Sequence, residues 1–358
     1  MSTDNSEIEG AQPVSAFCVA VLNDGSTVKV QGSSLSDFTL TLDKASLAWV
    51  DFTVSMLERD GSAAATALGF SPSLVQTLLT NRYSGYEDLE TELGLMLPAV
   101  RVDKPLEVDI YPLLILIRKG LIVTLHAEKV IRLLKFSKYA DVFMRKVNPN
   151  MLWNDKLTVL LTRIIDENNE KNFEGLRTIE DQSDEIGKFM IDPTMPKGQA
   201  IGQEIYKMKH ALITYLSTLW ASLDVIHSLR YGDAETMSDD RRLLQRIGML
   251  GDDVNRQIAL SEHMSEVMAS GLEVLQTIYN NQLQMLNNRF TLVATWLAVL
   301  AAAVMVPNTL ATVFGTSAFE SVPAGLVIII LILSTILSAF SVYLVLKIKG
   351  WLPRMESV

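Results

Sequence analysis

The C-terminal end of the chain holds two long runs without a charged side chain. The first runs from Phe290 to Phe319 and the second from Ser321 to Leu346, and only Glu320 separates them. Taken as helices, residues 290–314 and 325–346 are roughly 37 Å and 33 Å long, against a bilayer hydrocarbon core of about 30 Å. Helices buried in soluble proteins rarely reach this length without a charge. The pattern therefore predicts two membrane spans.

Basic residues flank the spans on one side only. Arg289 precedes the first span, and three basic residues follow the second: Lys347, Lys349 and Arg354. Short segments rich in Lys and Arg remain in the cytoplasm. We therefore expect both termini in the cytoplasm, the loop 315–324 outside and a basic cytoplasmic tail at 347–358. The first residues lack the basic and apolar regions of a cleavable signal, so the predicted location is the cytoplasmic (inner) membrane.

Composition limits the function classes. With 41 acidic against 31 basic residues, the chain has a net charge of −10, which argues against a nucleic-acid partner and favours cations. A single cysteine, Cys18, excludes an internal disulfide and a cysteine-cluster metal site, and we expect it as a small buried residue on a strand. No enzyme motif is present, and the histidines are scattered without ligand spacing: His126, His210, His227 and His263. We expect no enzyme and no covalently bound cofactor.

Residues 1–148 alternate strand-like and helix-like signals, which predicts a cytoplasmic α/β domain. Five segments rich in β-branched and aromatic residues are strand candidates: 16–22, 47–54, 95–102, 108–117 and 121–126. The sequence "RKG" at 118–120 predicts a hairpin turn, and Pro72 favours a short helix at 71–79.

The next segment, 149–236, is expected to be a cytoplasmic helical hairpin broken at "DPTMPKG" (192–198). Its first helix has an apolar face: Leu157, Leu160, Ile164, Leu176, Ile179 and Ile186. Its other face is acidic: Asp166, Glu167, Glu170, Glu174, Glu180, Asp181, Asp184 and Glu185. The second helix is expected at about 203–231.

A very long helix is expected after the hairpin. Ser238 is its predicted N-cap, and no proline follows until Pro307. Apolar residues recur every three or four positions, which predicts one stalk helix (237–289) that continues into the first span. If unbroken to Phe314, it is about 115 Å long. Because it cannot bury its own apolar stripe, we expect other copies of the chain to cover it.

The first span has one face of small and polar residues. These positions lie within about 60° of one line along the helix: Asn288, Thr291, Thr295, Ala298, Ala302, Met305 and Thr309. Such a face either packs tightly against another helix or lines a pore, where hydroxyl and amide groups bind the water shell of an ion. Pro307 leaves a carbonyl about one turn earlier without its donor, which requires that carbonyl to be buried or to face water. This favours the pore.

The order of these features resembles the CorA family of divalent-cation (Mg²⁺/Co²⁺) channels over most of the chain. The stretches "ALGFSPSLVQTLL", "LPAVRV" and "LIVTLH" look like its N-terminal domain, and "NNQLQMLNNRFTLVAT" (280–295) looks like the end of its stalk. "PNTLATVFGTSAFESVP" (307–323) looks like its pore mouth. The resemblance implies an α+β membrane protein with both spans in the lipid bilayer. It also implies a homo-oligomeric funnel, a homopentamer.

The chain departs from the family at the Gly-Met-Asn signature. Alignment on the glycine gives Gly315-Thr316-Ser317, and alignment on the following Phe-Glu gives Thr316-Ser317-Ala318. Neither register restores the asparagine that in the family holds hydrated Mg²⁺. The chain is therefore a divergent member by resemblance, and its ion preference is open.

Within the channel that the resemblance implies, the helical wheel suggests roles for individual residues. Four residues at the pore mouth are candidates for ion selection: Gly315, Thr316, Ser317 and Glu320. Asn308 and Thr312 join the small and polar face as pore lining. Ala298, Ala302 and Met305 would form an apolar constriction, which can gate by dewetting.

The family also has an inhibitory metal site between its N-terminal domain and its stalk. Candidates for such a site here are Asp252 and Asp253 on the stalk with Glu87 and Asp88. A solvated acidic face explains the same residues.

Three functions follow. The first is a channel that moves hydrated Mg²⁺, Co²⁺ or Ni²⁺ into the cytoplasm down the membrane potential, with the cation as substrate and regulator. The second is a ZntB-like Zn²⁺ carrier, proton-coupled or not, although the span lacks the nitrogen and sulfur ligands that Zn²⁺ prefers. The third is a non-conducting membrane-anchored scaffold or metal sensor.

Overall fold

The computed structural model describes residues 15–33, 35–81, 83–103, 106–191, 198–232, 234–316 and 322–348. The chain divides into two compact units, Met1–Leu272 and Glu273–Val358.

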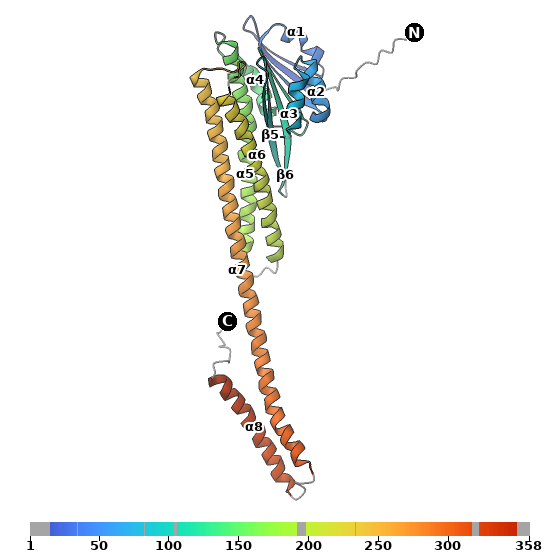
Figure 1. The fold of residues 1–358 in the computed structure, drawn as a ribbon, viewed down its shortest axis with the longest axis vertical. Coiled ribbons are helices and arrows are strands. Elements are labelled where there is room, and N and C mark those ends of the chain that lie inside the picture. Colours follow the sequence, from blue (N-terminus) through green and yellow to red (C-terminus); the bar gives the residue numbers. More distant parts are fainter. Residues whose placement is uncertain are drawn as a thin grey trace, which may run out of the picture. The chain divides into compact units, whose positions relative to one another are not determined.

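The N-terminal unit is built on a seven-stranded sheet (Figure 1) with the order β2-β1-β3-β7-β6-β5-β4. The strands are β1 (Ser15–Leu22), β2 (Thr27–Gly32), β3 (Ala45–Val54), β4 (Gly85–Asp88), β5 (Glu92–Asp103), β6 (Glu107–Arg118) and β7 (Leu121–Ala127). All neighbours are antiparallel except β3 and β7, which are parallel. The five predicted strands and the hairpin turn at 118–120 are confirmed.

Helices cover both faces of the sheet. On one face lie η1 (Leu35–Asp37), α1 (Thr39–Leu42), α2 (Leu57–Ala67) and α3 (Pro72–Thr80). Their side chains and those of the strands form one buried core that includes Val50, Leu74 and Leu116. On the other face lie α4 (Leu134–Arg145), α5 (Trp153–Ile191) and α6 (Gly198–Tyr231). Phe136 of α4 stacks on Trp49 of β3 at a centroid distance of 4.8 Å.

A buried ion pair joins the two parallel strands. His126 Nε2 of β7 lies 3.2 Å from a carboxylate oxygen of Asp51 on β3, and the hydroxyl of Thr124 also donates to Asp51. Burial lowers the pKa of His126, but the charge and hydrogen bond of Asp51 outweigh this effect, so the pKa is raised. The prediction of a buried Cys18 on a strand is confirmed, and burial raises the pKa of the Cys18 thiol to about 12.

The long helices pack through the predicted apolar positions. Leu157, Leu160, Ile164, Leu176 and Ile179 of α5 are buried, whereas the side chain of Ile186 lies outside the described residues. The acidic face is only partly solvated, because Glu167 is 1% exposed. The first part of α7 (Arg241–Phe314) packs on α5, and Gln257 Nε2 donates to the carbonyl of Asn169 at 3.2 Å.

The start of α7 corrects one prediction. The cap is Asp240 and not Ser238, because Asp240 Oδ1 accepts from the backbone N–H of Arg242 at 2.7 Å and of Leu243 at 3.3 Å. Ser238 instead donates its hydroxyl to Asp155 of α5 and accepts from the N–H of Asp240 at 3.0 Å.

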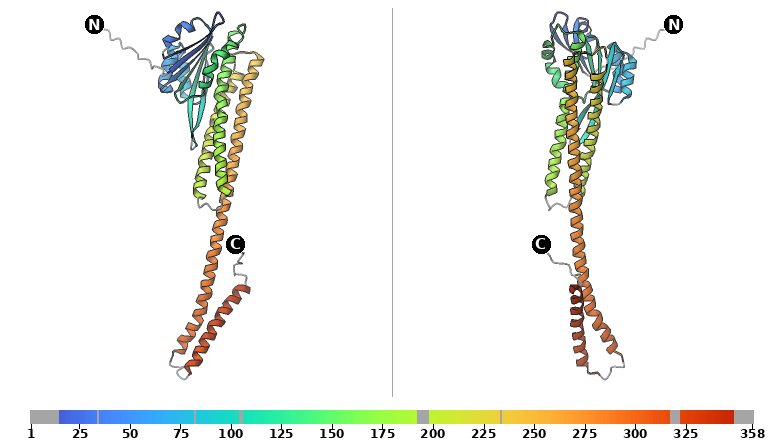
Figure 2. Two further views of the ribbon diagram at one scale, coloured as in Figure 1. Left: turned by 180° about the vertical axis from the view of Figure 1, so that it is seen from behind. Right: turned by 60° about the vertical axis from the view of Figure 1, so that its left-hand side comes forward.

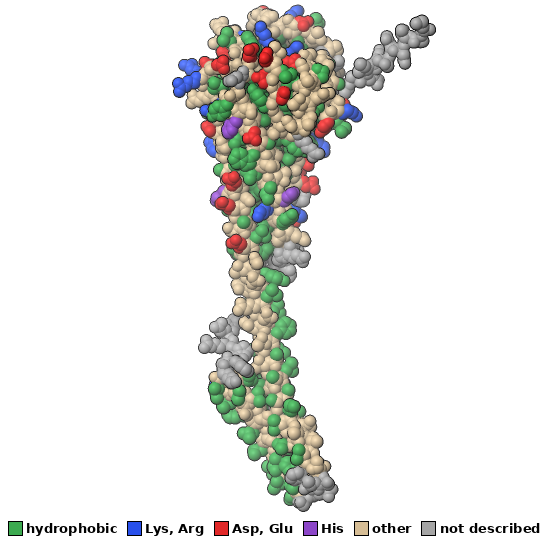
Figure 3. All heavy atoms as spheres, viewed as in Figure 1, with side chains coloured by type: hydrophobic (Ala, Val, Ile, Leu, Met, Phe, Trp, Pro, Cys, Tyr) green, Lys and Arg blue, Asp and Glu red, His purple; other side chains and the backbone are tan. Residues whose placement is uncertain are grey.

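The C-terminal unit consists of the rest of α7 and of α8 (Ala324–Ile348). Both helices are long and apolar enough to cross a membrane, and the apolar window of neither is buried. Figure 2 shows α8 beside the last part of α7, and in Figure 3 hydrophobic side chains gather over these two helices. α7 ends at Phe314, as predicted, and continues through Pro307.

Candidate functional site

The predicted pore-lining face of α7 is largely open to contact from outside the chain. Seven of its nine positions are exposed: Asn288, Thr291, Ala298, Met305, Asn308, Thr309 and Thr312. Thr295 and Ala302 are half-buried. No described residue of its own unit covers this face over most of its length, as is required of a surface that lines a pore or meets another copy.

α8 covers a neighbouring face of α7. Ser338 Oγ of α8 donates a hydrogen bond to the carbonyl of Ala302 at 2.9 Å. Val299 and Leu310 of α7 are also half-buried, and on a helical wheel they lie roughly 60° to 80° from Ala302. α8 thus covers one side of the small and polar face, including Thr295 and Ala302, and leaves Thr291, Ala298, Met305 and Thr309 exposed.

The threonine hydroxyls on α7 are oriented by the helix itself. Each donates to the carbonyl four residues earlier at 2.8 Å: Thr291, Thr295, Thr309 and Thr312. Because the hydroxyl proton is used within the helix, the oxygen can act toward other groups only as an acceptor, through its two lone pairs. A hydrated cation offers water O–H donors on its outer surface. The face is therefore suited to accept hydrogen bonds from such a shell.

Pro307 adds a further acceptor to this segment. It has no N–H, so the helix supplies no bond to the carbonyl of residue 303. One turn later, Thr309 donates to the carbonyl of Met305. Unpaired carbonyls are tolerated at membrane depth where they are buried or face water.

The end of α7 holds the first part of the predicted mouth. Gly315 and Thr316 are exposed, and Thr316 Oγ1 donates to the carbonyl of Val313 at 2.7 Å. Ser317 and Glu320 lie outside the described residues, so their place at the mouth stays a prediction.

The four acids suggested for a regulatory metal do not form a cluster within one chain. Among the residues that the structure describes, no group of three or more His, Cys, Asp or Glu side chains could hold a metal ion. Asp253 is paired with Arg256 of the same helix, and Asp88 Oδ1 accepts from the N–H of Glu90 at 3.0 Å. Asp252 is exposed and Glu87 is half-buried. A site shared between two copies stays a prediction.

Sequence reasoning missed Ser338. It belongs to a set of hydroxyl residues within the otherwise apolar α8, and Ser334 and Thr335 of that set donate only to the carbonyl of Leu331 in their own helix. A polar residue in an apolar span is a signal for helix contact. It does not indicate which of several hydroxyls makes the contact, because that depends on the pairing of two helices.

The fold agrees with comparisons with known proteins. The family model described as CorA-like Mg²⁺ transporter protein matches residues 44–347. The CorA magnesium transporter from Methanocaldococcus jannaschii has a similar structure, with 16% identity, a TM-score of 0.68, and coverage of 94% of this chain and 99% of that chain. The full-length CmaX protein is similar at 13% identity and a TM-score of 0.63, with 97% and 100% covered. A comparison with curated protein sequences gives no match.

Proposed function

The chain belongs to the CorA-like Mg²⁺ transporter family, and from this we propose that it forms a homopentameric channel for hydrated divalent cations. Mg²⁺ is the proposed physiological substrate, with Co²⁺ and Ni²⁺ as further substrates. Both termini lie in the cytoplasm, as the flanking basic residues indicate. Five copies of α7 surround the pore, and α8 lies outside them.

One observation carries this proposal: the exposed face of α7 with its oriented threonine oxygens. The face has hydrogen-bond acceptors in Asn288, Thr291, Thr309 and Thr312. It contains no charged residue between Phe290 and Phe314. An ion can therefore be held through its water shell without binding so tightly that it cannot leave.

The membrane potential is sufficient to drive this transport. A divalent ion that moves inward gains about 4.6 kcal/mol per 100 mV, twice the value for a single charge. At the outer end, Thr316, Ser317 and Glu320 would concentrate and orient the hydrated ion. Deeper in, Ala298, Ala302 and Met305 would form the apolar constriction, which closes by dewetting when it narrows.

The test is uptake of Mg²⁺, Co²⁺, Ni²⁺ and Zn²⁺ into proteoliposomes at a clamped potential. Thr309→Val keeps the side-chain shape but removes the acceptor from every copy around the pore. We expect it to lower Mg²⁺ uptake about tenfold, because each lost acceptor costs about 1 kcal/mol at an ion that contacts several copies. Thr335→Val on α8 is the matched control and should leave uptake unchanged.

The same assay separates the alternatives. Equal uptake by Thr309→Val and Thr335→Val would remove this face from the permeation path, and unchanged uptake and ion preference in Glu320→Ala with Thr316→Ala would remove the mouth. If Zn²⁺ is the only one of the four ions that is taken up, and its uptake depends on an imposed pH gradient, the protein is a proton-coupled Zn²⁺ carrier. An absence of flux for all four ions would leave a scaffold or sensor.

A further inference from the structure

A pocket of about 610 Å³ lies within the N-terminal unit, and its lining residues all belong to that unit. It is lined by the ends of β5 and β6, by the loop between β7 and α4, by α4 and by α5. Its volume is within the range of about 300 to 1,000 Å³ that is usual for clefts that bind small molecules. No part of the proposed transport mechanism uses it.

The pocket is basic although the chain is acidic. Its lining has two acidic residues, Asp103 and Glu174, and six basic ones: Arg101, Lys129, Arg132, Lys135, Lys138 and Lys171. The chain as a whole has a net charge of −10. The positive charge is therefore local to the pocket and does not reflect the net charge of the chain. A local positive charge of this kind attracts anions.

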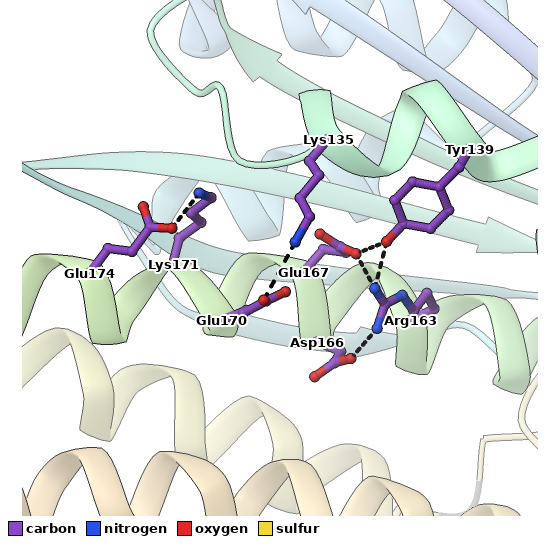
Figure 4. Close-up of polar contacts among 8 residues, drawn as sticks. All are labelled: Lys135, Tyr139, Arg163, Asp166, Glu167, Glu170, Lys171 and Glu174. Carbon is purple, nitrogen blue, oxygen red and sulfur yellow. Dashed lines mark hydrogen bonds and ion pairs between the residues drawn. The ribbon is translucent and has the colours of Figure 1, made fainter.

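Half of these cations have carboxylate partners at the rim. Lys135 Nζ lies 3.5 Å from Glu170, and Lys171 Nζ lies 2.6 Å from Glu174 (Figure 4). Arg101 Nε lies 2.9 Å from Asp103. Among the described residues, no ion pair involves the other three cations: Lys129, Arg132 and Lys138. The pocket therefore keeps an uncompensated positive charge.

Arg132 fixes part of this charge at the base of the pocket. Its side chain is buried, with only 5% of the residue exposed. Its guanidinium donates to the carbonyls of Asn168 and Val100 and, at 2.7 Å, to Asn172 Oδ1. All of these acceptors are neutral. Glu174 acts on this guanidinium through space, but no carboxylate forms an ion pair with it among the described residues. A buried guanidinium without a direct ionic partner is costly, and an anion in the pocket would supply one.

The remaining walls are apolar and aromatic. Val100, Val102, Val130, Ile131 and Leu134 line the pocket beside the basic groups. The Tyr111 ring also lines it, with Lys129 Nζ 5.7 Å from the ring centroid. A site for a bare inorganic ion needs no apolar wall, whereas an organic molecule with a phosphate group fits both kinds of surface.

We propose that this pocket binds a soluble phosphorylated small molecule of the size of a nucleotide. Lys129 and Lys138 would contact the phosphate groups, and Arg132 would stabilise their charge from below. The organic part of the ligand would lie against the apolar wall near Tyr111. This gives the N-terminal unit a ligand-binding function that is separate from ion conduction.

The test is binding of ATP to the full-length protein in detergent, measured by calorimetry. EDTA is included so that the nucleotide is not masked by Mg²⁺. We expect saturable binding that weakens with added salt, as charge attraction requires. Lys129→Glu and Lys138→Glu should each weaken it by about tenfold or more, because a charged hydrogen bond contributes about 1.5 kcal/mol or more. Lys44→Glu, at an exposed lysine outside the pocket, makes the same charge change and should leave binding unaffected.

Two further arms identify the source of the phosphate. Inorganic pyrophosphate should bind more weakly than ATP, because it cannot use the apolar wall. Phosphatidylglycerol vesicles should not displace ATP. The proposal is overturned if ATP does not bind, if Lys44→Glu weakens binding as much as Lys138→Glu, or if only the lipid binds. Amine labelling of Lys129 and Lys138 gives one more check. If assembly of several copies protects these lysines and ATP does not, the proposal is also overturned, because an acidic surface of another copy would then occupy the pocket.

Discussion

The two units of this chain use the same apolar residues in opposite ways. In the N-terminal unit, Leu116 is fully buried in the core against α2 and α3. In the C-terminal unit, Leu333 of α8 is 66% exposed, and α8 has no buried residue. The first unit completes its own core, while the second leaves its apolar surface to lipid and to other copies. The difference shows that one chain can combine a unit whose apolar residues are buried away from water with a unit whose apolar residues face outward, as a lipid environment allows.

Polar groups show the reverse contrast. The N-terminal unit buries Arg132 and Glu167 and bonds both to residues of distant elements. In the C-terminal unit, Thr291 and Thr312 of α7 bond to their own helix and remain exposed. The first arrangement fixes a unique packing. The second leaves hydroxyl oxygens on a surface that groups outside the chain can contact.

The largest effect should come from matched leucine truncations in the two units. Leu116→Ala leaves a cavity in a closed core and should destabilise the N-terminal unit by about 2 to 5 kcal/mol, a fall in its melting temperature of roughly 6 °C or more. Leu333→Ala should change it by less than 1 °C, because that side chain adds nothing to the core. Thermal unfolding of the full-length protein in detergent, followed by circular dichroism, measures both. Equal shifts would contradict the contrast between the units.

A smaller effect should separate buried from exposed charge within the N-terminal unit. Glu167 is buried and accepts from Arg163 and Tyr139, so Glu167→Gln leaves Arg163 with one carboxylate partner, Asp166, and the Tyr139 hydroxyl. We expect a loss of about 2 kcal/mol, less than for a fully buried pair because Arg163 is partly exposed. Glu170→Gln removes the exposed pair with Lys135 and should cost less than about 0.5 kcal/mol. Urea titration measures the free energy of unfolding of both variants. A larger loss for Glu170→Gln than for Glu167→Gln would contradict the description of Glu167 as the buried and Glu170 as the exposed partner.

The smallest effect concerns the contact between α7 and α8. Ser338→Ala removes the hydrogen bond to the carbonyl of Ala302 and should weaken helix association by about 0.6 kcal/mol, the average for such bonds in membranes. Ser334→Ala is the control, because Ser334 bonds only within α8. The temperature at which α8 loses protection from hydrogen exchange in lipid nanodiscs would report the difference. If both variants behave alike, the contact with Ala302 has no measurable role.

Much of the fold could be predicted because its signals are local. The absence of charge from 290 to 314 fixed the first span, and α7 ends at Phe314. Strands β3, β5, β6 and β7 follow from continuous apolar runs, which are typical of strands buried on both faces. The edge strands β2 and β4 were missed. β2 places Lys29 and Gln31 among its apolar residues, and β4 has only four residues.

The candidate sites divide in the same way. The small and polar face of α7 is visible in the sequence because it has the helical period. The basic pocket is not visible, because Arg101, Lys129 and Lys171 come from β5, a loop and α5 and meet only in the folded chain. The cap of α7 was misplaced by two residues because Ser238 and Asp240 are both good caps. The choice depends on Asp155 of α5, which takes the hydroxyl of Ser238.

The threonines of α7, whose hydroxyls donate to carbonyls of their own helix, have a consequence for the rate at which ions could pass the proposed pore. Mg²⁺ gives up its inner water molecules reluctantly, so a pore that required their removal would delay every ion at the entrance. Oxygen acceptors at Thr291, Thr309 and Thr312 can exchange hydrogen bonds with the outside of the shell while the shell itself stays whole. In the proposed pore the particle that is selected is then the hydrated ion, and its diameter rather than its bare radius decides what passes.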